Sequence, residues 1–470
     1  MVRRRGRKSS SIGWIILLIL IIGGGIAGAI FLYTAKDFER VPPTIETPQY
    51  SYWNAKDALK IKILDNYGLK RYQVTLSDGN SIVPVATADN LNGIKEKVIS
   101  VKYPDGKLNR QAKVLILKTQ ATDMSKWNYL MGNSAEKTIK LKIDYRRPDV
   151  TVLANSYSIA QGGSALVIFQ ASDDDALAKL YVEAGGRKYK AQPYKKKGYF
   201  VSLFAWPFTE EDFQAKVIAQ DKAGNSRAAE IPLYLKNRHY RISKIKASDS
   251  FIDGKITDLA EQEPKYMKDE RLARLKSVNE VMRKDNEALI HAYTSKVSDK
   301  MVESWKINPF HLLKNGQKVA SFGDHRYYYA KDKSKIISES YHLGYDMAST
   351  KMAPIFASNS GKVVFADYNG IYGNMPIINH GLGLYTLYGH CSTLLVKEGD
   401  EVHVGQMIAK TGMTGLAMGD HLHFGILVQG IEVRPVEWLD KKWIKDNIVK
   451  IFDDADKIIF NADNRTQTKK

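Results

Sequence analysis

The sequence Asp420-His421-Leu422-His423-Phe424 combines two histidines with the alternation of a β-strand. Successive side chains of a strand point to opposite faces, so the two histidines would share one face while the leucine and the phenylalanine face a core. The surrounding residues, 308–439, contain short apolar runs and frequent glycines. This composition predicts a compact β-rich domain with tight turns.

Two further stretches of the same region carry polar side chains of the same kinds. In Tyr341-His342-Leu343-Gly344-Tyr345-Asp346 the histidine and the aspartate are four residues apart, which places them on one face of a strand and also of a helix. Gly344 and its aromatic neighbours favour the extended form. Leu387-Tyr388-Gly389-His390 adds a histidine at the end of an apolar run.

These residue types fit the chemistry of a zinc hydrolase. Such enzymes hold Zn²⁺ with three ligands from His and Asp/Glu and leave a fourth position for water. The metal acidifies that water and polarises a carbonyl, while other groups move the proton and stabilise the oxyanion. The sequence contains no His-Glu-x-x-His, which excludes the helical protease motif. A single cysteine, Cys391, excludes a disulfide and a cysteine-built metal site.

The ordered motifs resemble the signature of LytM/lysostaphin-type zinc peptidases, which cut peptide bonds in bacterial peptidoglycan. The matching stretches are His342-x-x-x-Asp346, Asn379-His380-Gly381, Tyr388-x-His390, Gly412-Met413-Thr414-Gly415 and His421-x-His423. The resemblance covers residues 308–440, under a third of the chain.

The resemblance implies that His342, Asp346 and His423 bind Zn²⁺, and that His390 and His421 flank the metal-bound water. One of these two histidines would be the base and the other the oxyanion stabiliser, and the sequence leaves their order open. The remaining histidines and the cysteine are expected to be structural: His239, His291, His311, His325, His380, His403 and Cys391.

The N-terminus predicts a membrane anchor. Residues 12–33 form an uncharged, mostly apolar run of 22 residues, long enough to cross a bilayer as a helix. The basic residues before it would keep the N-terminus cytoplasmic and export the rest; they are Arg3, Arg4, Arg5, Arg7 and Lys8. A cleaved signal peptide is the alternative, since Ala27-Gly28-Ala29 matches a cleavage pattern, but the apolar run continues beyond it.

The charge of the chain bears on its partners. Lysine and arginine number 70 against 51 acidic residues, a net charge of +19, while 44% hydrophobic residues exclude a mainly disordered chain. Basic chains often bind nucleic acid, but no nucleic-acid module is recognisable and export separates the chain from that partner. We expect anionic lipids or cell-wall carboxylates instead; dispersed surface lysines without a partner are the alternative.

The whole chain predicts a mainly β protein of several parts. An internal repeat, offset by 105 residues at Pro43 and Pro148, indicates two immunoglobulin-like β-sandwiches at 42–146 and 147–242. A helical connector follows because apolar residues recur at helical spacing from Leu272 to Leu289. The full predicted order is a cytoplasmic tail (1–11), an anchor (12–33), the two sandwiches, the connector (243–307), the peptidase domain (308–440), and a C-terminal helix around 443–452 with a polar tail (441–470).

These expectations combine into a membrane-anchored zinc endopeptidase of peptidoglycan. The Ig-like repeats beside an anchor look similar to cell-shape endopeptidases of diderm bacteria, which implies a D,D-endopeptidase in the inner membrane with its bulk in the periplasm. The sandwiches would act as a spacer or bind protein partners. The alternatives are a non-catalytic peptidoglycan-binding scaffold or hydrolase activator, and a latent enzyme whose segment 255–300 blocks the groove.

Overall fold

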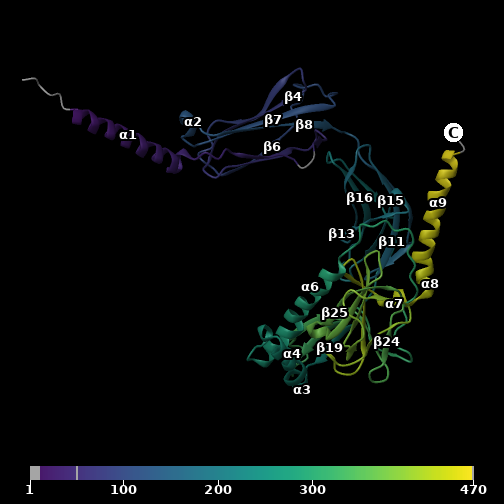
Figure 1. The fold of residues 1–470 in the computed structure, drawn as a ribbon. Helices are drawn as coiled ribbons and strands as arrows, with labels where there is room; N and C mark the ends of the chain where they lie inside the picture. Colours follow the sequence, from purple (N-terminus) through teal and green to yellow (C-terminus); the bar gives the residue numbers. More distant parts are fainter. Residues whose placement is uncertain (1–10, 49–50, 468–470) are drawn as a thin grey trace, which may run out of the picture. The chain divides into compact units, whose positions relative to one another are not determined.

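The computed structural model describes residues 11–48 and 51–467, and its helices and strands are labelled in Figure 1. The predicted basic tail before residue 11 and the last three residues lie outside the described chain. The described chain is mainly β, as the sequence predicts. It divides into two compact units, 1–147 with 221–225, and 148–220 with 226–470.

The first unit begins with helix α1 (Ser11–Thr34), whose apolar run is long enough to cross a membrane, a property that it shares with signal sequences. Two sheets follow, with Trp53, Ile61 and Leu117 buried in their core. One sheet has the order β1 (Thr44–Glu46), β3 (Leu59–Leu64), β6 (Glu96–Val101), and the other β2 (Tyr52–Trp53), β8 (Ser134–Ile143), β7 (Val114–Asp123), β4 (Leu69–Ser77), β5 (Ile82–Ala88). Short helical turns lie at η1 (Lys36–Phe38) and α2 (Trp127–Leu130).

The second unit also opens with a pair of sheets, here of four strands each. One has the order β14 (Gln192–Tyr194), β15 (Lys196–Ala205), β11 (Ser164–Ser172), β9 (Asp149–Asn155), and the other β13 (Arg187–Lys190), β12 (Leu177–Ala184), β16 (Ala215–Asp221), β17 (Ser226–Glu230). Strand β10 (Ser158–Ala160) pairs with β18 (Tyr234–Lys236). Both segments of the predicted repeat therefore contain two sheets, and their immunoglobulin-like character stays a prediction, as do the domain boundaries.

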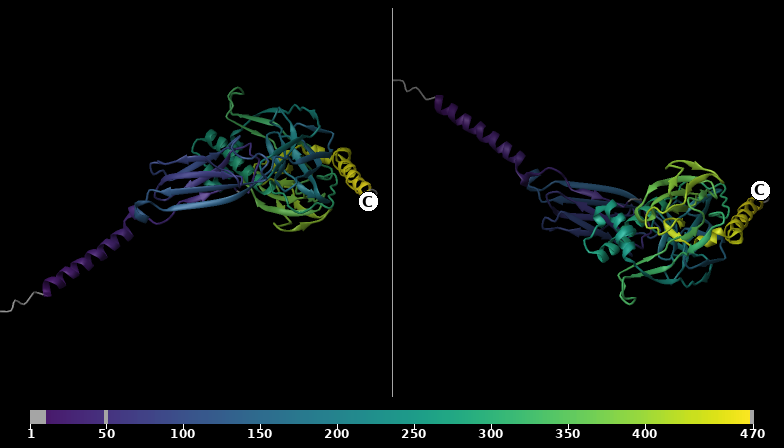
Figure 2. Two further views of the ribbon diagram at one scale, coloured as in Figure 1. Left: turned by 90° about the horizontal axis from the view of Figure 1, so that it is seen from above. Right: turned by 90° about the horizontal axis from the view of Figure 1, so that it is seen from below.

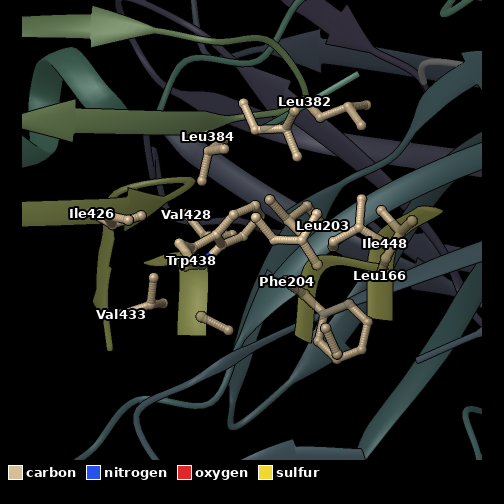
Figure 3. Close-up of a cluster of buried hydrophobic side chains, with 14 of the residues drawn as sticks. Leu166, Leu203, Phe204, Leu382, Leu384, Ile426, Val428, Val433, Trp438 and Ile448 are labelled. Atoms are coloured by element: carbon tan, nitrogen blue, oxygen red, sulfur yellow. The ribbon is translucent and has the colours of Figure 1, made fainter. Parts of the chain in front are cut away.

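The core of this sandwich continues into the C-terminal domain. Leu166 and Phe204 of the sandwich belong to the same buried cluster as Val428 and Trp438 (Figure 3). The helices that close the chain add Ile448, Ala455 and Ile459 to this cluster. These helices are α7 (Pro435–Leu439), α8 (Lys441–Ile444), η6 (Lys445–Val449) and α9 (Lys450–Gln467), the last drawn in yellow in both views of Figure 2. The terminal helix is thus longer than predicted, because its apolar stripe packs on the sandwich.

The connector is helical and packs on the C-terminal domain. Its segments are α3 (Asp249–Phe251), η2 (Ile252–Ile256), α4 (Thr257–Gln262), η3 (Pro264–Tyr266), α5 (Arg271–Lys276), η4 (Ser277–Met282) and α6 (Arg283–Thr294). Leu275, Val278 and Met282 are fully buried in one cluster with Ile371 and Tyr372 of the following domain. The predicted apolar stripe therefore serves as a packing surface.

The C-terminal domain is built on an eight-stranded antiparallel sheet. Its order is β20 (Gln317–Ala320), β23 (Tyr345–Ala348), β31 (Leu422–Val428), β27 (Leu384–Gly389), β26 (Asn374–Asn379), β25 (Gly361–Tyr368), β29 (Glu401–Val402), with β32 (Ile431–Val433) paired to β31. Asp346 and Gly389 both lie opposite His423, one on each side of β31. Directly opposed residues share a face of a sheet, so this register brings Asp346 and His423 together.

Two smaller sheets flank the large one. They have the orders β19 (Ile242–Lys246), β21 (His325–Tyr329), β22 (Ser338–Tyr341), and β24 (Pro354–Phe356), β30 (Met407–Lys410), β28 (Thr393–Leu394). The short turn η5 (Gly370–Tyr372) lies between β25 and β26.

His380 is buried in the turn between β26 and β27. Its Nδ1–H donates to the carbonyl of Ser360 at 2.9 Å, and its Nε2 accepts the hydroxyl proton of Thr386 at 2.8 Å. Burial lowers the pKa of His380 to about 4, so the ring is neutral in the folded chain. These contacts give His380 the structural role expected of it.

We expect the stability of the fold to decline as the pH falls from about 6.5 to 4. The unfolded chain binds a proton at His380 near pH 6.5 and the folded chain does not until about pH 4, so acid favours unfolding by up to about 3 kcal/mol. Thermal unfolding of the full chain in detergent, from pH 8 to pH 4, measures this. The variant His380→Gln should show a flatter profile in this window, and an unchanged slope would contradict the assignment.

Candidate metal centre

The five side chains singled out in the sequence lie together in one groove of about 830 Å³. His342 directly follows β22, and Asp346 lies on β23. His423 lies on β31, His421 directly precedes that strand, and His390 directly follows β27. Segments up to 81 residues apart in the chain thus converge at one end of the sheet.

Three of these residues place their polar atoms at distances suited to one metal ion. Oδ1 of Asp346 lies 2.9 Å from Nε2 of His342 and 2.9 Å from Nδ1 of His423. The two nitrogens are 3.2 Å apart. Zn²⁺ with tetrahedral bonds of about 2.0–2.1 Å separates its ligand atoms by roughly 3.3 Å. The three atoms therefore match three corners of a zinc tetrahedron within a few tenths of an ångström.

The orientation of His342 is fixed by a second hydrogen bond. Its Nδ1–H donates to the carbonyl of Ser321 at 2.8 Å, which directs Nε2 at Asp346. The expected continuous strand from Tyr341 to Asp346 is interrupted, because β22 ends at Tyr341 and β23 begins at Tyr345. Two backbone hydrogen bonds stabilise the chain at this interruption. The N–H of Gly323 donates to the carbonyl of His342, and the N–H of His342 donates to the carbonyl of Asp324.

His423 is held by close packing. Its ring centroid lies 5.4 Å from that of Tyr372, and Gly344 approaches its Cε1 and Nε2 atoms. A Cβ atom at Gly344 would lie 2.5 Å from both Cε1 and Nε2 of His423. Residue 344 must therefore lack a side chain for His423 to keep this position.

Burial and the mutual contacts set the charges of the three groups. Burial alone would raise the pKa of Asp346, but the attraction and hydrogen bonds of His342 and His423 outweigh it and hold this pKa well below its usual range. Burial lowers the pKa of His423 to about 4. A carboxylate and a neutral imidazole are the forms that bind a metal ion.

His390 and His421 lie side by side next to this triad, with ring centroids 4.8 Å apart. Nδ1–H of His390 donates to the carbonyl of Thr414 at 2.9 Å, and Nδ1–H of His421 donates to that of Gly419 at 2.8 Å. In both rings Nε2 is then free to accept a proton. His421 Nε2 lies 3.7 Å from Oδ2 of Asp346.

His390 has an unusual backbone, with φ at +63°. Non-glycine residues adopt this region at an energetic cost, and such residues concentrate at functional sites. The conformation is held by the carbonyl of Tyr372, which accepts the N–H of His390 at 2.8 Å. Burial lowers the pKa of His390 to about 3, so the ring is neutral.

The connector supplies support that the sequence did not reveal. Oδ1 of Asn286 in α6 accepts the N–H of Ile371 at 2.9 Å, and its carbonyl accepts Nδ2 of Asn369 at 3.2 Å. Asn286 thus holds turn η5, whose Tyr372 contacts both His390 and His423. Asn286 is more than 80 residues from this turn in the sequence, so no local pattern marks it.

Three further residues of this region lie outside the triad. Cys391 is buried, and burial raises the pKa of its thiol to about 12. His325 stacks on Tyr341 and lies 3.1 Å from Glu339. Arg326 faces the groove and pairs with Asp324 at 3.3 Å.

The fold and the site define a β-rich hydrolase domain with a His/Asp/His triad suited to a divalent metal. The sequence matches Peptidase family M23 over residues 340–435. It is 41% identical over 98 residues to lipoprotein NlpD of Yersinia enterocolitica, a match that covers 21% of this chain and 100% of that sequence. The chain belongs to peptidase family M23 through this C-terminal domain.

Two other relatives match over the same domain. The chain is 40% identical over 95 residues to peptidoglycan DD-endopeptidase ShyA of Vibrio cholerae, which covers 20% of this chain and 21% of the relative. It is 39% identical over 107 residues to murein hydrolase activator NlpD of Escherichia coli, which covers 22% of this chain and 28% of the relative. The chain thus spans about a fifth to a quarter of the length of these two proteins.

We expect the substitution Gly344→Ala to weaken zinc binding by the triad. The added Cβ must push His423 away from Asp346, so zinc affinity should fall at least 10-fold. Zinc bound per chain after dialysis at defined free zinc measures this.

The matched control is Gly254→Ala, because a Cβ at Gly254 meets no atom within 4 Å. Equal zinc binding by Gly344→Ala and Gly254→Ala would contradict the role given to Gly344.

Proposed function

We propose that the protein is a membrane-anchored, zinc-dependent endopeptidase that hydrolyses peptide cross-links of bacterial peptidoglycan as a D,D-endopeptidase. The observation that carries this proposal is the complete set of groups in one groove. Three buried ligand atoms lie within 3.2 Å of one another, and two further histidines present free Nε2 atoms beside them. The similarity to a DD-endopeptidase over the same domain supports the substrate class.

His342, Asp346 and His423 would hold the Zn²⁺, which supplies Lewis acidity toward water and the scissile carbonyl. Of His390 and His421, one would act as the base and the other would stabilise the oxyanion. Both Nε2 atoms start as acceptors, because each Nδ1–H is committed to a backbone carbonyl. The histidine that takes the proton of the attacking water becomes a donor, and can return that proton to the leaving amine.

The location is proposed from the N-terminal part of the chain. Helix α1 has the length and composition of a single membrane span. With the basic residues before it, the positive-inside rule gives a cytoplasmic N-terminus and a periplasmic bulk at the inner membrane. The peptide stems of peptidoglycan are then the partner within reach, and the sandwiches would act as a spacer or bind protein partners.

A second candidate is an activator of another wall hydrolase. The matches to NlpD proteins favour it, since one of these relatives is named as a murein hydrolase activator. The presence of all five polar groups in the groove favours the enzyme, because a purely binding role does not need free proton acceptors beside a metal triad.

We expect the full chain in detergent to cut cross-links of purified peptidoglycan in the presence of zinc. A chelator should abolish the reaction and added zinc should restore it, because water activation requires the metal. Separation of the soluble fragments by chromatography and mass spectrometry measures the cleaved bond.

The variants His423→Ala and His421→Ala should each lower the rate by at least 100-fold, since one removes a ligand and the other a proton carrier. His403→Ala is the matched control, because His403 is exposed and lies outside the groove. If wild-type protein with zinc leaves all cross-links intact but accelerates another wall hydrolase, the activator is correct and the enzyme is wrong.

A further inference from the structure

Strand β19 forms a wall of the metal groove although it lies outside the residues matched to the family. It spans Ile242–Lys246, whereas the family match begins at residue 340. It pairs in parallel with β21, from Ile242 opposite His325 to Lys246 opposite Tyr329. β19 is the edge strand of its sheet.

The outer edge of β19 carries unpaired backbone groups. The carbonyl of Arg241 accepts the N–H of His325, and the N–H of Ala247 donates to Tyr329, both at 2.8 Å. Parallel pairing uses alternate residues, so the odd-numbered residues bond to β21 and the even-numbered ones face the other edge. Within the described chain, no backbone partner is found on that edge for Ile242, Lys244 or Lys246.

This open edge borders the same groove as the metal triad. The groove is lined by the consecutive residues 241–246 together with His342, Asp346 and His423. Side chains of consecutive residues alternate in direction, so a continuous lining indicates that the strand presents its backbone to the groove. An extended chain lying there would have the strand on one side and the triad within reach.

Ser243 and Ile245 hold β19 on one face, and Lys244 and Lys246 project from the opposite face; Arg241, which directly precedes the strand, is basic as well. Ser243 donates to Asp324 at 2.7 Å, and Ile245 packs against the buried cluster of the domain. Arg241, Lys244 and Lys246 are exposed. Among the described residues none of these three cations is within ion-pair distance of a carboxylate. β19 and the residue before it therefore carry three uncompensated positive charges beside the open edge.

We propose that β19 is the substrate-binding strand of the groove. An extended peptide that carries free carboxylates adds along its open edge through hydrogen bonds to the backbone of Ile242, Lys244 and Lys246, while the basic side chains bind the carboxylates. Edge strands bind extended peptides in this way, with the backbone supplying affinity and the side chains selectivity. The inference rests on the proposed function and names how that site recognises its substrate, an acidic peptide stem.

The test compares Lys244→Pro with Lys244→Ala in the full chain in detergent. Both variants lose the amine, but only proline also loses the N–H, which β21 does not use. Binding of a fluorescent cross-linked stem peptide is measured by anisotropy on a His390→Ala background, and KM and kcat on the active background. We expect Lys244→Ala to weaken binding several-fold in a salt-dependent manner, and Lys244→Pro to weaken it about 3- to 10-fold further.

A second pair guards against a folding defect. Ile242→Pro and Ile242→Ala change the first residue of β19, where proline is tolerated, and melting temperatures check both pairs. A peptide with amidated carboxylates should bind wild type and Lys244→Ala alike. Equal affinity of the Pro and Ala variants in both pairs, or no difference between acidic and amidated peptide, overturns the proposal.

These outcomes are separable from the proposed function. If wild type binds the peptide and the proline variants lose it, but no bond is cut, the strand proposal holds and the endopeptidase is wrong. If wild type cuts the peptide and each Pro variant equals its Ala partner, the endopeptidase stands and the strand proposal falls.

Discussion

The antiparallel pairing of β23 with β31 is the constraint on which the site depends. It sets Asp346 directly opposite His423, so one carboxylate oxygen meets the nitrogens of two histidines. A shift of one residue in either strand would send one of the two side chains to the opposite face. The buried apolar residues that alternate with the histidines, Leu422 and Phe424, resist that shift because it would expose them.

The site also depends on residues that are distant in the sequence. Asn286 holds η5, and η5 in turn places the carbonyl of Tyr372 against the backbone of His390. His390 needs this partner because its positive φ is costly. The connector thus reaches His390 through two hydrogen bonds, and its buried stripe packs against η5.

Much of the site could be predicted from the sequence because its groups sit in short ordered motifs. The alternation around His421 and His423 indicated their shared face, and the motif resemblance supplied the grouping with His342, Asp346 and His390. The supporting contacts could not be predicted, since Asn286 and β19 meet the domain through pairings with no local signature. The same holds for α9, whose extent is set by packing on a sandwich nearly 300 residues earlier.

The shared core of Figure 3 bears on how this protein transmits mechanical load. Leu166 and Phe204 of the sandwich interdigitate with Val428 and Trp438, and β31 continues from that core to His423. Close-packed interiors yield little under strain, so this core couples the sandwich firmly to the sheet that carries the His/Asp/His triad. A pull on this sandwich would therefore be transmitted to the groove through the shared core.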